Sequence, residues 1–157
     1  MADENRIHNI TIKWTYPRVI ENIDTCWESN QNGLYYVSRI FGRRETPIYI
    51  GETKRDFITR INEHYKAISN LFNKRGIKKI RLGIIVRPKS LSNYDDSEFK
   101  NLLRTIESRL IKYLNQKGHG GSLCNKRQVS SYTESFKLNI ENIGYRGSLP
   151  GYLPYEE

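Results

Sequence analysis

The chain has 157 residues, and 26 Lys and Arg against 17 Asp and Glu give it a net charge of +9. No apolar run approaches the roughly 18 residues of a membrane span, and no hydrophobic signal segment follows the N-terminus. Cys26 and Cys124 form no C-x-x-C motif, which disfavours a disulfide framework and a thiolate metal site. We therefore expect a cytoplasmic protein with no membrane association. The charge predicts a nucleic-acid partner, with solubility as the alternative reason for it.

The length predicts one domain over residues 1–157. The first element in chain order is a short strand over 10–14, where apolar and polar residues alternate. Residues 33–41 (GLYYVSRIF) and 48–51 (IYIG) predict two further strands. Between them, 42–47 (GRRETP) is typical of a hairpin loop because it combines Gly, Pro and charge.

Apolar residues recur at helical spacing over 56–73, which predicts the first helix. A third strand of the central region is predicted over 79–87. A second long helix is predicted from Asp96 or Ser97, either of which can cap it, to about residue 116. The order strand, strand, helix, strand, helix, with neighbouring strands in a hairpin, predicts an α+β fold.

Two tripeptides mark the predicted hairpin: Gly33-Leu34-Tyr35 on its first strand and Tyr49-Ile50-Gly51 on its second. The following helix carries Arg60 and, four residues later, His64, and the second helix carries Glu107. In this order and on these predicted elements, the residues resemble the signature of the GIY-YIG nuclease family. Either tripeptide alone is a weak signal, but the ordered set is specific.

The resemblance covers residues 33–125, where Asn125 matches the Asn of the loop after the glutamate helix. It implies a small α+β fold with a three-stranded, mainly antiparallel sheet flanked by helices. Residues 1–32 and 126–157 are then N- and C-terminal extensions, the parts in which family members differ most and which usually recognise the target.

The resemblance also implies an activity: hydrolysis of DNA phosphodiester bonds with Mg²⁺ on Glu107, Mn²⁺ being a possible substitute, leaving 5′-phosphate and 3′-hydroxyl ends. Double-stranded DNA is the expected substrate, and a chain with two extensions resembles restriction-type members most. The resemblance leaves the oligomeric state open, with a homodimer as one possibility. The alternatives are a catalytically silent nucleic-acid-binding module and an RNA-directed nuclease.

The residues themselves give independent reasons for some of these roles. At about 100° per residue, Glu107 falls inside the apolar arc of its helix, between Leu103 and Ile111. A carboxylate on a core-facing arc is costly unless it is paired or bound to a metal. Arg104 and Arg109 are close enough in sequence to pair with it, and Mg²⁺ is the other interpretation, since it needs only one or two carboxylates.

Arg60 suits a phosphate clamp, because its planar guanidinium bonds two oxygens and stays charged. His64, one turn away, is a candidate to hold a phosphate or to share a proton with the nucleophile. Tyr35 is expected to align or deprotonate the attacking water and Tyr49 to support the phosphate geometry. Lys54 is a weaker candidate for charge stabilisation. Asn125 is expected to hold the loop of the metal-binding glutamate or a DNA phosphate.

Two basic groups are expected to contact DNA phosphates rather than to read sequence, although solvated surface charge is an equal alternative. They are Arg39, Arg43 and Arg44 around the hairpin, and Lys74, Arg75, Lys78, Lys79 and Arg81 near the third strand.

Overall fold

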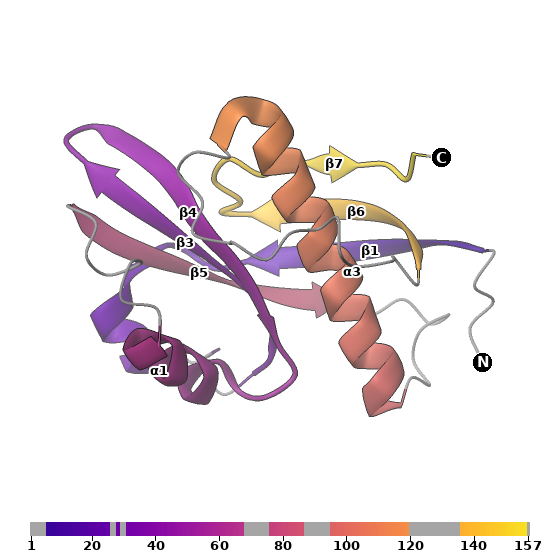
Figure 1. Ribbon diagram of the computed structural model, residues 1–157, viewed down its shortest axis with the longest axis horizontal. Coiled ribbons are helices and arrows are strands. Elements are labelled where there is room, and N and C mark those ends of the chain that lie inside the picture. Colours follow the sequence, from indigo (N-terminus) through magenta and orange to yellow (C-terminus); the bar gives the residue numbers. More distant parts are fainter. Residues whose placement is uncertain are drawn as a thin grey trace.

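The computed structural model describes residues 6–25, 28, 31–67, 76–86, 95–119 and 136–156. Their strands form one curled, mixed sheet in the order β4-β3-β5-β1-β6-β7, with β2 also paired to β5 (Figure 1). The strands are β1 Ile7–Trp14, β2 Arg18–Val19, β3 Gly33–Phe41, β4 Arg44–Thr53, β5 Ile77–Val86, β6 Lys137–Gly144 and β7 Tyr152–Leu153.

The α-helices in the described ranges are α1 (Phe57–Ala67) and α3 (Asp96–Leu114). Short irregular helical turns, η1 (Ile20–Thr25) and η4 (Asn115–His119), precede β3 and follow α3. None of the helices in these ranges is long and apolar enough to cross a membrane. The cap of α3 is Asp95, one residue before the predicted one, because its carboxylate accepts a hydrogen bond from the Glu98 backbone N–H at 2.8 Å.

The prediction of a three-stranded sheet flanked by helices is wrong, because the sheet has seven strands. The three predicted strands are present as β4, β3 and β5, but the two flanking regions add four more. In β1, Ile10, Ile12 and Trp14 alternate with polar residues and are buried. This apolar face packs in the same core as α3. The backbone of β1 pairs antiparallel with β5 on one edge and parallel with β6 on the other.

Two core clusters lie on opposite faces of the sheet. One joins α3 to β1, β6 and the inner positions Leu34, Tyr36 and Ile50 of the central hairpin. The other joins α1 and η1 to β5 and to Tyr35 and Val37. Neighbouring residues of β3 therefore serve different cores, as expected for a strand covered on both sides.

The central hairpin is longer than predicted. β3 and β4 pair up to Phe41 and Arg44 through a two-residue turn, so most of the predicted loop 42–47 is strand. At the other end, Gly33 has a φ of +145°, and a Cβ there would overlap the Gly83 carbonyl oxygen of β5. Only glycine satisfies both conditions, which is the physical role of the first residue of the Gly33-Leu34-Tyr35 tripeptide.

Arg81, predicted to contact phosphate, is instead an internal residue of β5. Its side chain is 6% exposed and forms an ion pair with Glu45, and it also donates to the Ser38 hydroxyl at 3.3 Å. Burial raises the pKa of Glu45, but the bonds from Arg81 and Ser38 and the charge of Arg81 outweigh that effect and lower it. The pair ties β4 and β5 to the middle strand β3.

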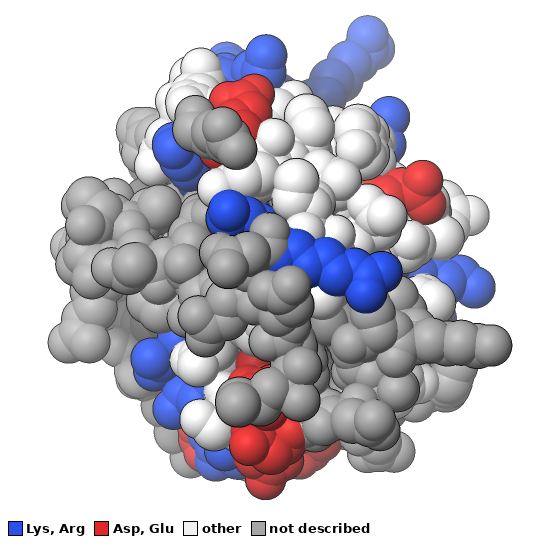
Figure 2. Space-filling model, turned by 90° about the vertical axis from the view of Figure 1, so that its right-hand side faces the viewer, with Lys and Arg blue, Asp and Glu red and all other residues white. Residues whose placement is uncertain are grey.

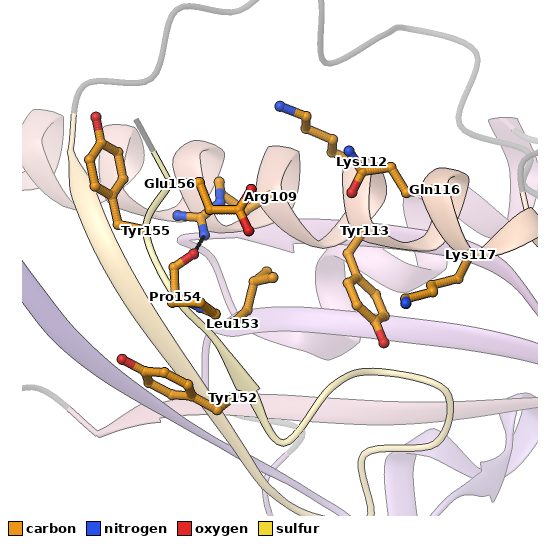
Figure 3. Close-up of a pocket in the computed structure, with 10 residues that line it drawn as sticks. All are labelled: Arg109, Lys112, Tyr113, Gln116, Lys117, Tyr152, Leu153, Pro154, Tyr155 and Glu156. Atoms are coloured by element: carbon orange, nitrogen blue, oxygen red, sulfur yellow. Dashed lines mark hydrogen bonds between the residues drawn. The ribbon is translucent and has the colours of Figure 1, made fainter.

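Arg109 of α3 holds the C-terminal segment rather than Glu107. Its guanidinium donates to the carbonyl oxygens of Leu138 and Pro154 at 2.9 and 2.8 Å. Figure 3 shows the hydrogen bond from Arg109 to Pro154. It lies at one side of a hollow of about 330 Å³ that is lined by α3 and by the residues around β7. One side chain thus fixes both the β6 strand and the chain that follows β7.

Arg109→Ala should lower the free energy of unfolding by about 1.5–3 kcal/mol, because two carbonyls lose a charged donor. Lys112→Ala is the matched control, since Lys112 lies exposed on the same helix and lines the same hollow. Urea denaturation of both variants measures the difference. Equal stability of the two variants would show that Arg109 does not hold the C-terminal segment.

Candidate active site

Tyr35 and Tyr49 lie side by side on the face of the sheet that α1 covers. Their rings stack with centroids 5.9 Å apart and planes 17° apart, and Tyr35 is only 2% exposed. A register shift places them there: Val37 pairs with Tyr49 and Ser38 with Pro47, so Ile48 is an extra residue. Such a bulge re-aims the side chains beside it, and here both Ile48 and Tyr49 pack on the α1-side core.

Gly51 explains how Tyr35 reaches the edge of the sheet. β4 is the edge strand, and Gly51 pairs with Tyr35 across the hairpin. A Cβ on Gly51 would overlap the ring carbon and the hydroxyl of Tyr35. The tyrosine ring therefore occupies the space of the missing side chain. The last residue of the Tyr49-Ile50-Gly51 tripeptide is glycine for this steric reason.

The two tyrosine hydroxyls share a hydrogen bond. Burial raises the pKa of Tyr35 far above its ordinary value and that of Tyr49 to about 12. The charge of Glu107 also raises both pKa values, against the charge of Arg60, which lowers them. Both phenols therefore stay protonated near neutral pH.

Two carboxylates approach the same strand from the α3 side. Glu107 lies on α3, which packs on β4, and Glu52 follows Gly51 in β4. Burial and then the neighbouring charge of Glu52 raise the pKa of Glu107 to about 8, against the charges of Arg104 and Arg60, which lower it. Burial also raises the pKa of Glu52. In the described ranges Glu107 forms no ion pair, so neither Arg104 nor Arg109 neutralises it by direct contact.

Arg60 carries a positive charge that acts on all four of these acidic groups. It lies on α1 with its side chain 35% exposed and contacts Glu63 at 3.4 Å. Burial raises the pKa values of the surrounding acidic groups, and the charge of Arg60 lowers each of them. We call Arg60 and these groups the candidate site: Tyr35, Tyr49, Glu52, Arg60 and Glu107.

The remaining predicted site residues have varied positions. Lys54 is exposed just after β4, where its backbone carbonyl accepts a hydrogen bond from Asn32 at 2.9 Å, and its charge acts on Glu52. His64 belongs to α1, but its side chain lies outside the described residues. Asn125 also lies outside them.

The predicted phosphate contacts gather at the turn end of the central hairpin. Arg39 and Lys78 are neighbours in β3 and β5, and Lys79 follows in β5. Arg43 and Arg44 are exposed at the turn itself. The Nε of Arg39 is buried and has no hydrogen-bond partner in the described ranges. Lys74 and Arg75 lie outside the described residues.

One face of the molecule carries Lys and Arg side chains mixed with other residues. Figure 2 views the molecule from the right-hand side of Figure 1. In the described part of this face, Lys and Arg side chains lie apart from one another, among uncharged and acidic ones.

Sequence analysis missed Glu52. Alternate residues of β4 face the core that α3 covers, and the buried Ile50 is one of them. Glu52 lies two positions after Ile50 and therefore faces the same side. A carboxylate at such a position is the same conflict that singled out Glu107. Applying that criterion to strands as well as to helices would have found it.

Replacement of Glu107 by Gln should change how stability depends on pH in metal-free buffer. The folded-state pKa of about 8 exceeds the ordinary 4.5. The contribution of the protonated carboxyl is therefore complete below about pH 4.5 and is lost as the pH rises through about 8. Glutamine cannot ionise, so the variant should gain stability relative to wild type over this range in urea denaturation with chelator. A variant destabilised at every pH by about 3–5 kcal/mol would instead indicate a broken ion pair.

Comparison of the chain with models of known families, with curated proteins and with solved structures finds no match. A function for this protein therefore depends on the motif residues and on the geometry described above.

Proposed function

We propose that this protein is a metal-dependent endonuclease that hydrolyses phosphodiester bonds of double-stranded DNA. The observation that carries the proposal is the convergence of Tyr35, Tyr49, Arg60 and Glu107 around one strand edge. These residues come from four elements, and they are the ones that the resemblance to GIY-YIG nucleases singles out. The resemblance supplies the reaction class, and the placement of the side chains supports it.

The donor set fits a hard divalent cation. Glu107 and Glu52 are two carboxylates whose pKa values burial raises, and the charge of Glu52 raises that of Glu107 as well. Mg²⁺ binds through one or two carboxylates plus waters and substrate phosphate oxygens. In the described ranges no three His, Cys, Asp or Glu side chains cluster, so a site made wholly of protein ligands is not present there. A bound cation would supply charge stabilisation at the phosphate oxygens.

Burial distinguishes the two tyrosines. Tyr35 is nearly fully buried, so we assign it to positioning Tyr49 through their shared hydrogen bond, in place of the predicted role on the attacking water. Tyr49 is less buried, and its phenol can donate a hydrogen bond to a phosphate oxygen, which is the role that the sequence predicted for it.

Arg60 is placed to bind the phosphate that reacts. Its side chain is partly exposed and its single described ion pair, with Glu63, is long at 3.4 Å. A planar guanidinium can bond two phosphoryl oxygens and remain charged as negative charge develops. Arg39, Arg43 and Arg44 would bind the DNA backbone further along the same hairpin.

The proposal predicts that plasmid DNA is cut with Mg²⁺ and that chelator stops the reaction. Arg60→Ala should slow cleavage by on the order of 10²–10³, because it removes a donor to the developing charge. Arg60→Lys should recover little, since a point charge does not replace the bidentate group. Quantified gel assays measure all the rates, and unfolding measured alongside should change little because exposed pairs contribute about 0–1 kcal/mol.

Arg55→Ala is the matched control, because Arg55 contacts the same Glu63 carboxylate, at 2.8 Å, but does not act on the tyrosine pair. It should cleave at close to the wild-type rate. Wild-type protein that binds plasmid without cutting it would identify a silent binding module. Cleavage of RNA with DNA left intact would reassign the substrate.

A further inference from the structure

A second feature lies on the α1 side of the sheet, beyond the candidate site. A hollow of about 340 Å³ opens at the end of β1, and Ile84, which packs against the α1-side core, forms part of its floor. Its size is in the usual range of ligand pockets. Other residues that line it are Lys13, Trp14, Tyr16, Arg18, Gln31 and Tyr145.

Two exposed tyrosines form a fixed corner of this hollow. The rings of Tyr16 and Tyr145 are 5.0 Å apart and inclined at 82°, yet they are 59% and 56% exposed. The backbone N–H of Tyr145 donates to the Trp14 carbonyl at 3.2 Å. Gly144 before it has a φ of +79°, and a Cβ there would overlap that same carbonyl oxygen. The backbone thus holds the aromatic corner in place.

The corner has the geometry of a base-stacking site. A planar ring that lies flat on one tyrosine presents its edge to the face of the other, which is the favourable arrangement of perpendicular aromatic groups. Gln31, at another wall, has a side-chain amide that can both donate to and accept from the edge of a base.

Positive charge flanks the corner. Lys13 and Arg18 line the hollow, are exposed, and form no ion pair with any residue in the described ranges. The hollow also contains Glu28, which leaves a net positive charge. An apolar peptide or a lipid chain carries no negative charge to pair with these two cations. A nucleotide within a strand has one phosphate on its 5′ side and one on its 3′ side, which can pair with both.

We propose that the corner formed by Tyr16 and Tyr145 stacks one unpaired nucleobase of a bound strand while Lys13 and Arg18 contact the adjoining phosphates. This inference rests on the proposed function for its choice of nucleic acid as the ligand. Strands about 4.8 Å apart that rise about 3.4 Å per residue place the backbone of Lys13 roughly 12 Å from that of Tyr35. That separation corresponds to about three or four base steps.

The hollow of Figure 3 is a weaker candidate for the same role. Its Arg109 already donates to two carbonyl oxygens, and the ammonium of its Lys117 lies 5.6 Å from the Tyr113 ring centre. Those groups serve contacts within the chain.

The test measures the binding of a fluorescein-labelled single strand, and of a duplex with one bulged base, by fluorescence anisotropy in chelator. Tyr16→Ala and Tyr145→Ala should each weaken binding about tenfold or more, as expected for the loss of base–aromatic stacking. Tyr16→Phe should bind almost as wild type because it keeps the ring. Tyr152→Ala is the matched control, since Tyr152 is 58% exposed but lies on β7.

Unchanged binding by both alanine variants, an equal loss in Tyr152→Ala, or no binding of the single strand by wild type would each overturn the stacking site. Circular dichroism verifies that the variants are folded. Plasmid cleavage by the same wild-type protein separates the two proposals. Cleavage together with tyrosine-independent binding removes the stacking site alone, whereas tyrosine-dependent binding without cleavage supports it and removes the nuclease.

Discussion

The candidate site depends on one steric condition, the absence of a side chain at Gly51. The ring of Tyr35 fills that space and thereby reaches the edge of the sheet, where its hydroxyl bonds that of Tyr49. Any Cβ at this position would push the ring away. Glu52, the next residue of β4, lies on the opposite face toward Glu107. A single edge strand therefore brings together side chains from both faces, which a strand in the middle of the sheet cannot do.

The site also concentrates groups that do not favour the fold. Two partly buried carboxylates, Glu52 and Glu107, lie near each other. The hydroxyls of Tyr35 and Tyr49 are largely removed from water and share one hydrogen bond. Such local conflicts are typical of functional sites, where stability is sacrificed for chemistry. Elsewhere in the described ranges, two buried or half-buried arginines join separate elements. Arg81 ties three strands together, and Arg109 binds two segments that lie far apart in the sequence.

Local patterns predicted much of the central region but not the sheet around it. The strand bearing Tyr35, the helix bearing Arg60 and the apolar arc containing Glu107 follow from periodicity over a few residues. The parallel pairing of β1 with β6 joins residues about 130 positions apart, such as Ile10 with Ile140, and no local pattern encodes it. The extra residue Ile48, which sets the direction of Tyr49, depends in the same way on the partner strand. The sequence therefore singled out Tyr35, Tyr49, Arg60 and Glu107 as candidates, whereas their arrangement around β4 and the position of Glu52 required the structure.

The central claim is that a divalent cation bound at Glu107 lies beside the tyrosine pair, and titration with Mn²⁺ followed by NMR of ring-labelled tyrosines tests it most directly. A paramagnetic ion held at Glu107 should broaden the signals of Tyr35 and Tyr49 first. Tyr152, at the opposite edge of the sheet, should stay sharp, and Glu107→Gln should abolish the selective broadening. Signals of Tyr35 and Tyr49 that stay as sharp as that of Tyr152 at saturating Mn²⁺ would contradict the account.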